Sequence, residues 1–319
     1  VNNLIGAGLQ DNGNTWSING GPWKHTMQGD GGYFYFLRDK IVLMRNALVN
    51  NAPIWRAEWD GTNLVLKDVV PVDKQKPGAN IPNLNNAGIC IVNSPRTWDP
   101  GNTKIYAFGW VGNDLYSFWN PTGVKGWRWE YEATIPGMRP GEVITTAGSP
   151  TGEVCFFATS LGRVFTYNRT TGVVSTPHTM AVSGIANAED FGINRLCVLS
   201  NNSAFALYNP WRSAPFDRGY VLRYDGTQWT PLPTRTGGTI PVQRYYAIEA
   251  DWTNMNRLVL CSDDKVYSSS DMGNTWEEQS NGLPKRAHLS DIRFVQFPNG
   301  TKRFYMGSFG RSVWHADIR

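Results

Sequence analysis

The sequence lacks the features that mark several common classes of protein. No apolar stretch approaches the roughly 18 residues that a membrane-spanning helix needs. Lys and Arg are scattered, and the formal net charge of +4 is modest. No basic run of the kind that binds nucleic acid or a membrane surface is present. We therefore expect neither a nucleic-acid partner nor membrane insertion.

The chain also lacks the common signatures of metal, phosphate and nucleophile chemistry. Its four cysteines form no Cys-x-x-Cys pair, its four histidines stand in unrelated contexts, and no Gly-x-Ser-x-Gly or phosphate-binding glycine loop occurs. The cysteines lie in separate apolar, strand-like segments, which predicts free thiols in the core. We expect no metal and no cofactor. The cysteines are Cys90, Cys155, Cys197 and Cys261.

What the chain does contain points to short strands and tight turns. Among 319 residues there are 33 Gly and 14 Trp, and 41% of the residues are hydrophobic. Glycine is common in turns and tryptophan is enriched in strands, so the composition favours an all-β fold. All-β folds often run to this length as one domain. We expect residues 1–319 to form a single domain, which is part of a longer extracellular protein.

Internal repeats define the architecture. A glycine-containing turn recurs between apolar strands, as at Ser160–Arg163 and Ser308–Arg311, and an Asp/Asn-Gly type turn follows one strand later, as at Tyr224–Thr227. The unit of about 40 to 50 residues fits a four-stranded antiparallel propeller blade. We predict a seven-bladed β-propeller, with six blades as the alternative. The groups span Leu4–Met27, Gly32–Val70, Ala87–Thr134, Val143–Met180, Gly184–Pro233, Arg244–Pro284 and His288–Ile318.

Two loops are predicted to be oversized, at Val70–Asn86 and Asn201–Arg218. Long loops on a rigid scaffold commonly carry ligand contacts.

The stretch Tyr267–Trp276 resembles the Asp-box of sialidase-like propellers, which are also called BNR-repeat proteins. Ser-x-Asp-x-Gly-x-Thr-Trp is matched by Ser269, Asp271, Gly273, Thr275 and Trp276. We expect Asp271 to accept hydrogen bonds from backbone N–H groups two or three residues on. Gly273 is expected to take a positive φ, and Trp276 to cover the hairpin. These residues are therefore structural.

A second resemblance lies near the N-terminus. Gly8–Gly13 reads Gly-Leu-Gln-Asp-Asn-Gly and Gly29–Gly32 reads Gly-Asp-Gly-Gly, a pair similar to that of secreted and xyloglucanase-like members of the same group. Asp11 aligns either with an outer hairpin turn or with the turn between the second and third strands of a blade, and we favour the second. In the group that turn shares a face with the blade-to-blade loops, and active sites sit there. Asp11 and Asp30 are then a candidate acid/base pair within about 10 Å, although for each the role of a turn former is the favoured interpretation.

Other candidate ligand-binding residues follow from the same face and from aromatic chemistry. Two arginines of the glycine turns, Arg163 and Arg311, are expected near the central channel. Exposed indoles can stack on sugar rings, yet tryptophan also fills the space between blades. The candidate tryptophans are Trp110, Trp127 and Trp129.

Three functions remain open. The first is a non-enzymatic recognition or structural propeller, secreted or on the cell surface, that binds carbohydrate or a partner protein. The second is a glycoside hydrolase of the xyloglucanase-like type, or a polysaccharide lyase. The third is an assembly or scaffold factor. A sialidase proper is disfavoured because the Phe/Tyr-Arg-Ile-Pro motif of that family is missing.

Overall fold

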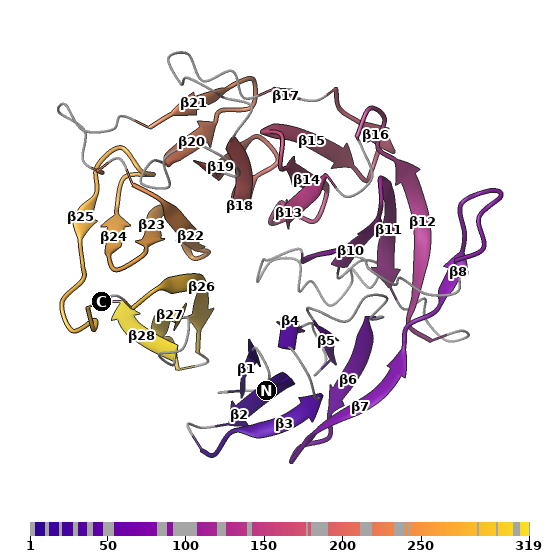
Figure 1. Cartoon of the computed structure of the whole chain (residues 1–319), viewed down its shortest axis with the longest axis horizontal. Coiled ribbons are helices and arrows are strands. Elements are labelled where there is room, and N and C mark those ends of the chain that lie inside the picture. Colours follow the sequence, from indigo (N-terminus) through magenta and orange to yellow (C-terminus); the bar gives the residue numbers. More distant parts are fainter. Residues whose placement is uncertain are drawn as a thin grey trace. The chain divides into compact units, whose positions relative to one another are not determined.

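The regular structure of the described residues consists of β-sheets, in which all strand pairs except one are antiparallel. The computed structural model describes residues 4–9, 13–18, 21–27, 31–36, 41–46, 54–81, 88–91, 107–119, 126–138, 142–176, 178–179, 191–210, 219–232, 240–241, 243–285, 287–297, 299–308 and 313–318. Every regular element among these residues is a strand (Figure 1). No helix in this part of the chain is long and apolar enough to cross a membrane.

Contacts divide the chain into two compact units. The first comprises Val1–Val92 with Thr97–Pro140, and the second comprises Asn93–Arg96 with Gly141–Arg319. Whether residues 1–319 act as one domain stays a prediction. The described strands form seven sheets, three in the first unit and four in the second. Apart from one added strand, each sheet lies in one of the seven predicted repeat groups. The strand bounds agree to within one residue in five groups, whereas the strands begin only at Phe191 in the group Gly184–Pro233 and end already at Glu278 in the group Arg244–Pro284.

The first unit holds a three-stranded, a four-stranded and a five-stranded sheet. The three-stranded sheet contains β1 (Leu4–Leu9), β2 (Gly13–Ile18) and β3 (Lys24–Met27). The four-stranded sheet contains β4 (Gly31–Phe36), β5 (Ile41–Asn46), β6 (Trp55–Trp59) and β7 (Leu64–Val69). The five-stranded sheet contains β8 (Val72–Lys74), β9 (Gly88–Ile91), β10 (Ala107–Val111), β11 (Asp114–Trp119) and β12 (Arg128–Thr134), in the order β8-β12-β11-β10-β9.

The second unit holds four sheets, in which consecutive strands are neighbours except that β17 pairs with β15. The first contains β13 (Val143–Gly148), β14 (Val154–Thr159), β15 (Arg163–Asn168), β16 (Val173–Val174) and β17 (His178–Thr179). The next two contain β18 (Phe191–Ser200), β19 (Ser203–Pro210), β20 (Tyr220–Tyr224), β21 (Trp229–Pro231), then β22 (Tyr245–Asp251), β23 (Asn254–Ser262), β24 (Val266–Ser269) and β25 (Glu277–Glu278). The last contains β26 (Leu289–Gln296), β27 (Lys302–Ser308) and β28 (Val313–Ile318).

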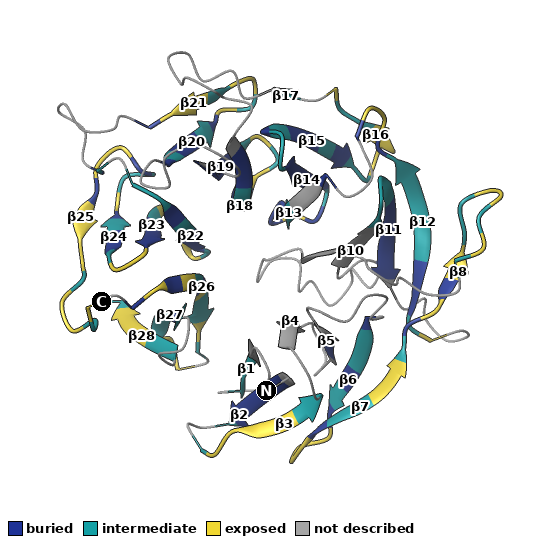
Figure 2. Cartoon of the chain, viewed as in Figure 1, coloured by how far each residue is buried: buried dark blue, intermediate teal, exposed yellow. Residues whose placement is uncertain are grey.

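Neighbouring sheets of the second unit bury both faces of their middle strands. In β19, Ala204, Ala206 and Tyr208 pack toward the β13–β17 sheet, whereas Phe205 and Leu207 pack toward the β22–β25 sheet. Successive side chains of a strand point to opposite faces, so a strand between two sheets must be apolar at nearly every position. This explains the continuous apolar runs of the sequence in these strands, which are largely buried (Figure 2).

The hairpin that leads to β25 is closed by the side chains of Ser269–Trp276. Asp271 accepts hydrogen bonds from the Thr275 backbone N–H (2.8 Å) and hydroxyl (2.6 Å). The Thr275 donors lie four residues on, beyond the predicted two or three, whereas the backbone of Asn274, three residues on as predicted, also hydrogen-bonds to Asp271 and lowers its pKa. Met272 and Gly273 both take left-handed φ values, of 58° and 80°. The Gly273 N–H donates to Ser269 Oγ (2.8 Å), and the indole of Trp276 is buried.

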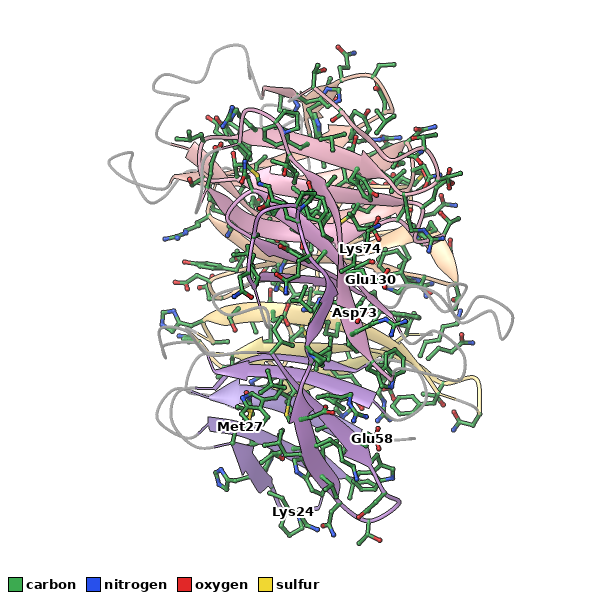
Figure 3. All side chains as sticks on the ribbon, turned by 90° about the vertical axis from the view of Figure 1, so that its right-hand side faces the viewer. Lys24, Met27, Glu58, Asp73, Lys74 and Glu130 are labelled. Atoms are coloured by element: carbon green, nitrogen blue, oxygen red, sulfur yellow. The ribbon has the colours of Figure 1, made fainter. Side chains whose placement is uncertain are left out.

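Both predicted long loops contain strands. β19 occupies much of Asn201–Arg218, so that the prediction of a long loop there is wrong. β8 lies within Val70–Asn86 and pairs in parallel with β12 (Figure 3). Arg128 of β12 lies 3.4 Å from Asp73 of β8, and Lys76 binds Asp114 at 2.9 Å. Pairing between strands holds this stretch against its sheet. The sequence of a short polar segment gives no sign of such pairing.

Candidate functional site

The first strand of each sheet in the second unit carries an irregularity near its start. The pairing register shifts between Val143 and Thr145, Ile193 and Arg195, Tyr245 and Ala247, and Leu289 and Asp291. A bulge redirects the side chains that follow it and is common beside functional sites. Arg195 and Asp291 therefore occupy matching positions in their sheets, immediately after the bulge.

These first strands lie side by side and bring four charged residues together. β22 contacts both β18 and β26 (Figure 1). Arg195 forms an ion pair with Asp291, and Arg293 lies 3.2 Å from Asp291 and 3.8 Å from Glu249. We call Arg195, Glu249, Asp291 and Arg293 the inner-strand charge cluster. The side chains of Arg293 and Asp291 are 45% and 38% exposed, so the cluster is open to solvent.

Glu249 forms the buried base of this cluster. Its side chain is only 6% exposed, and Oε1 has no hydrogen-bond partner. Burial raises the pKa of Glu249 to about 7, the Asp291 carboxylate adds to the rise, and the guanidinium groups of Arg293 and Arg195 oppose it. Near neutral pH this carboxyl group can therefore donate or accept a hydrogen bond.

The same end of the sheets is fixed by links between neighbouring sheets. The Asn209 side-chain amide donates to the Tyr245 carbonyl at 2.6 Å, at the start of β22. Asp263 lies 2.7 Å from the His288 ring, and the Leu289 N–H donates to the Asp263 carbonyl at 3.3 Å, at the start of β26. Because the backbone under the cluster is held by these contacts, its charged side chains project from a fixed base.

At the opposite end of the sheets, the aspartate carboxylates accept hydrogen bonds from residues of their own turns. Asp225 accepts hydrogen bonds from the Thr227 N–H, the Thr227 hydroxyl and the Gln228 N–H, at 2.7 to 2.9 Å. Asp60 and Asp271 are bonded in a similar way. Hydrogen bonds to the ionised form, from the backbone of Gln228 above all, lower the pKa of Asp225 to about 2. These carboxylates close turns.

Arg163, a predicted ligand-binding residue, is bound to a buried carboxylate. Its Nε donates to Glu142 Oε1 at 2.8 Å, and its Nη2 also bonds Glu142. Its guanidinium carbon lies 5.3 Å from the centroid of the Phe165 ring. The pair joins the residue before β13 to the start of β15, and its role in ligand binding stays a prediction.

The predicted tryptophans differ in exposure. Trp129 is fully buried beside Phe118, at 5.0 Å between ring centroids, which is a packing position. Trp127 is half-buried and stacks on the same ring at 4.8 Å between ring centroids. Trp110 belongs to β10, and its side chain lies outside the described part of the structure. Sugar stacking by these residues stays a prediction.

Three further predicted residues, Asp11, Asp30 and Arg311, lie outside the described residues. The strands that flank Asp11, β1 and β2, are the first two of their sheet, and the outer hairpin follows between β2 and β3. The turn at Asp11 thus joins the first two strands of the described sheet, and its alignment with the turn between the second and third strands of a blade stays a prediction. The proposed pairing of Asp11 with Asp30 remains a hypothesis.

The inner-strand charge cluster was not found from the sequence. A signal was present, since Arg195, Glu249, Asp291 and Arg293 interrupt strands that are otherwise largely apolar. A charge inside a buried strand costs free energy unless it is paired, so such residues demand partners. The predicted core thiols Cys155, Cys197 and Cys261 are buried and form no disulfide, whereas the side chain of Cys90 lies outside the described part of the structure.

The comparisons with known proteins identify a fold class. No protein-family model matches the sequence, and no curated protein matches it. A solved structure, the WD40 domain of Neurospora crassa Pan2, is similar with a TM-score of 0.60 over 99% of this chain and 86% of that chain, at 12% identity. The chain is an all-β protein with a β-propeller fold of four-stranded antiparallel sheets, as the repeats predicted. Because 1179 solved chains match, the fold alone does not define a function.

Proposed function

We propose that the chain is a non-enzymatic recognition propeller of the Asp-box type, which binds a partner protein or a glycan through the inner-strand charge cluster. The observation that carries this proposal is the contrast between the two ends of the sheets. At one end, Arg293 and Asp291 are partly exposed and form an ion pair with each other. Exposed ion pairs contribute little free energy, so a ligand can replace one partner at small cost.

The chemistry of the cluster suits a ligand that carries both charged and hydroxyl or amide groups. Two guanidinium groups can donate to a carboxylate or sulfate, and Asp291 can accept from an amine or a hydroxyl group. Glu249 adds an oxygen that lacks a partner. Acidic glycans and peptides of mixed charge share this chemistry. We further propose that the chain is part of a longer protein that lies outside the cell or on its surface. This part of the proposal rests only on the resemblance of Ser269–Trp276 and Gly8–Gly13 to the Asp-box group.

Binding is tested on glycan and peptide arrays with the whole chain and two matched variants. Asp291→Asn keeps the shape of the side chain and removes its charge. Arg223→Gln is the control, since Arg223 lies at the opposite end and bonds only Asn274 among the contacts found, at 3.2 Å. We expect the wild type and Arg223→Gln to bind the same ligands and Asp291→Asn to lose them. Equal binding by all three proteins would refute the proposed surface.

A glycoside hydrolase is the second candidate, and one observation favours it. Glu249, with a pKa near 7, lies in one cluster with Asp291, and two carboxyl groups in different environments are what acid/base hydrolysis needs. A reducing-sugar assay on polysaccharides decides between the candidates. Hydrolysis that disappears in Glu249→Gln would replace the recognition proposal, whereas binding without release of sugar ends would support it.

A further inference from the structure

The last strand of the second unit, β28, forms the edge of its sheet. In the other three sheets of this unit, the third strand is followed by a further strand, which is β16, β21 or β25. Among the described residues, β28 pairs with β27 on one side and with no strand on the other. An edge of this kind presents unpaired backbone N–H and C=O groups along its length.

β28 is also more exposed than its counterparts. The equivalent strands β15, β20 and β24 contain no exposed residue, whereas His315, Ala316 and Asp317 are exposed (Figure 2). The side chains of His315 and Asp317 are 50% and 52% exposed. These groups are accessible to another strand.

The residues of this edge are self-complementary about Ala316: residues at equal distances on either side can pair favourably with each other. Trp314 and Ile318 stand two positions away on either side, and both pack against the core cluster between β22–β25 and β26–β28. His315 and Asp317 flank Ala316 and point to the other face, where they lie opposite Tyr305 and Arg303 of β27. The order is therefore apolar, basic, small, acidic and apolar.

We propose that β28 pairs in antiparallel fashion with β28 of a second copy of this chain, with Ala316 at the two-fold axis. Two identical strands that pair about a two-fold axis place one residue opposite its own copy. With Ala316 at that position, each His315 faces Asp317 of the other copy, and each Trp314 faces Ile318. Opposite charges and apolar pairs directly across a ladder both stabilise it.

The neighbouring registers are unfavourable. A shift that centres the pair on His315 places two histidines opposite each other, and a shift that centres it on Asp317 places two carboxylates opposite each other. Like charges that face each other directly are destabilising. Centring on Trp314 or Ile318 shortens the ladder. In the Ala316 register, Asp317 lies between Arg303 of its own chain, with which it is paired, and His315 of the second copy.

Charge reversal tests this interface in the whole chain by sedimentation velocity over a wide range of concentrations. We expect a concentration-dependent dimer for the wild type. Asp317→His places His opposite His, His315→Asp places Asp opposite Asp, and each variant should raise the dissociation constant about tenfold because two pairs are lost per dimer. The double variant His315→Asp/Asp317→His restores opposite charges in both pairs and should restore the dimer.

A second His–Asp pair in the same unit supplies the matched control. Asp263 and His288 are also about half exposed and in contact. Exchange of these two residues should leave the dimer unchanged. Thermal unfolding of every variant confirms that the sheet is intact.

Ala316→Cys tests the register independently of charge. At the two-fold axis the two introduced thiols lie directly opposite, within reach of a disulfide after mild oxidation, whereas His315→Cys places its thiol opposite Asp317. Cross-linking of the first variant only is expected. A chain that stays monomeric at its highest soluble concentration would overturn the proposal, as would a dimer that survives both single charge reversals. Either outcome would indicate that β28 pairs with a strand of a different polypeptide or that any dimer forms through another surface.

Discussion

Arg195 and Asp291 form an ion pair although they are separated by 96 residues in the sequence. They lie on the first strands of two sheets, and β22 of the intervening sheet contacts both strands. The pair therefore connects three consecutive sheets of the second unit through their inner strands. A bulge precedes each of the two residues, so the same local irregularity directs both side chains.

This ion pair should couple the stability of its sheets. In a double-mutant cycle with Arg195→Gln and Asp291→Asn, we expect a coupling free energy of roughly 0.5–1 kcal/mol, because the partners are partly exposed. Urea denaturation measures it. The Lys265–Glu278 pair, which is more exposed and lies within one sheet, is the control and should give less. A coupling no larger than that of the control would contradict an inter-sheet role.

Glu249 should make stability depend on pH in a defined direction. Its pKa is raised from 4.5 to about 7 in the folded state, chiefly by burial. The folded state therefore holds its proton more tightly, and this contribution is fully present below pH 4.5 and lost as the pH rises through 7. The expected loss is on the order of 3 kcal/mol, at about 1.36 kcal/mol per pKa unit.

Glu249→Gln isolates this effect, because glutamine is uncharged at every pH. Relative to the wild type, the variant should gain most of that free energy of unfolding between pH 5 and pH 8. Urea denaturation at both pH values checks the prediction. A difference between variant and wild type that is the same at pH 5 and pH 8 would show that Glu249 does not titrate in this range.

The hairpin aspartates should stabilise the fold in the opposite pH direction. Hydrogen bonds, the Thr275 hydroxyl first, lower the pKa of Asp271 from 3.8 to about 2. Its stabilisation is present above pH 3.8 and is lost as the pH falls through 2. Asp271→Ala should therefore lower the melting temperature at pH 7 but not at pH 2. Asp264→Ala, at an exposed turn, serves as the control, and an equal effect of both substitutions at pH 7 would refute the role of Asp271.

Gly219 should tolerate no side chain. A Cβ atom at this position would lie 2.3 Å from Asn209 Oδ1 and 2.7 Å from the Gln243 carbonyl oxygen. Gly219→Ala would displace the Asn209 side chain from Tyr245, and we expect a loss of about 1–3 kcal/mol of unfolding free energy. Gly307→Ala is the control, because its nearest neighbours would be 3.8 Å away. Equal stability of the two variants would contradict the predicted clash.

Local turn chemistry made much of the fold predictable. Gly273 takes a positive φ of 80° as expected, the glycines of the recurring turns do the same, with 66° at Gly162 and 98° at Gly226, and Asp225 binds backbone N–H groups two and three residues on. Each turn is encoded within a few residues, so the spacing of turns revealed the sheets. The parallel strand β8 was missed because three residues of mixed polarity show no strand period until they meet β12.

The site was less predictable because its contacts are distant in sequence. Arg163 could be placed at a turn, but its pairing with Glu142 depends on β13 lying beside β14. The Arg195–Asp291 contact depends on the packing of separate sheets. No pattern within one repeat specifies such pairs.

The affinity of the inner-strand charge cluster for a ligand tests the central claim most directly. For the ligand that the arrays select, titration calorimetry on the wild type, Arg293→Gln and Arg223→Gln compares one charge within the cluster with one at the opposite end. The proposal predicts a dissociation constant at least about tenfold higher for Arg293→Gln, as loss of a charged hydrogen bond implies, and an unchanged value for Arg223→Gln. Unchanged binding by Arg293→Gln, or an equal loss in Arg223→Gln, would contradict it.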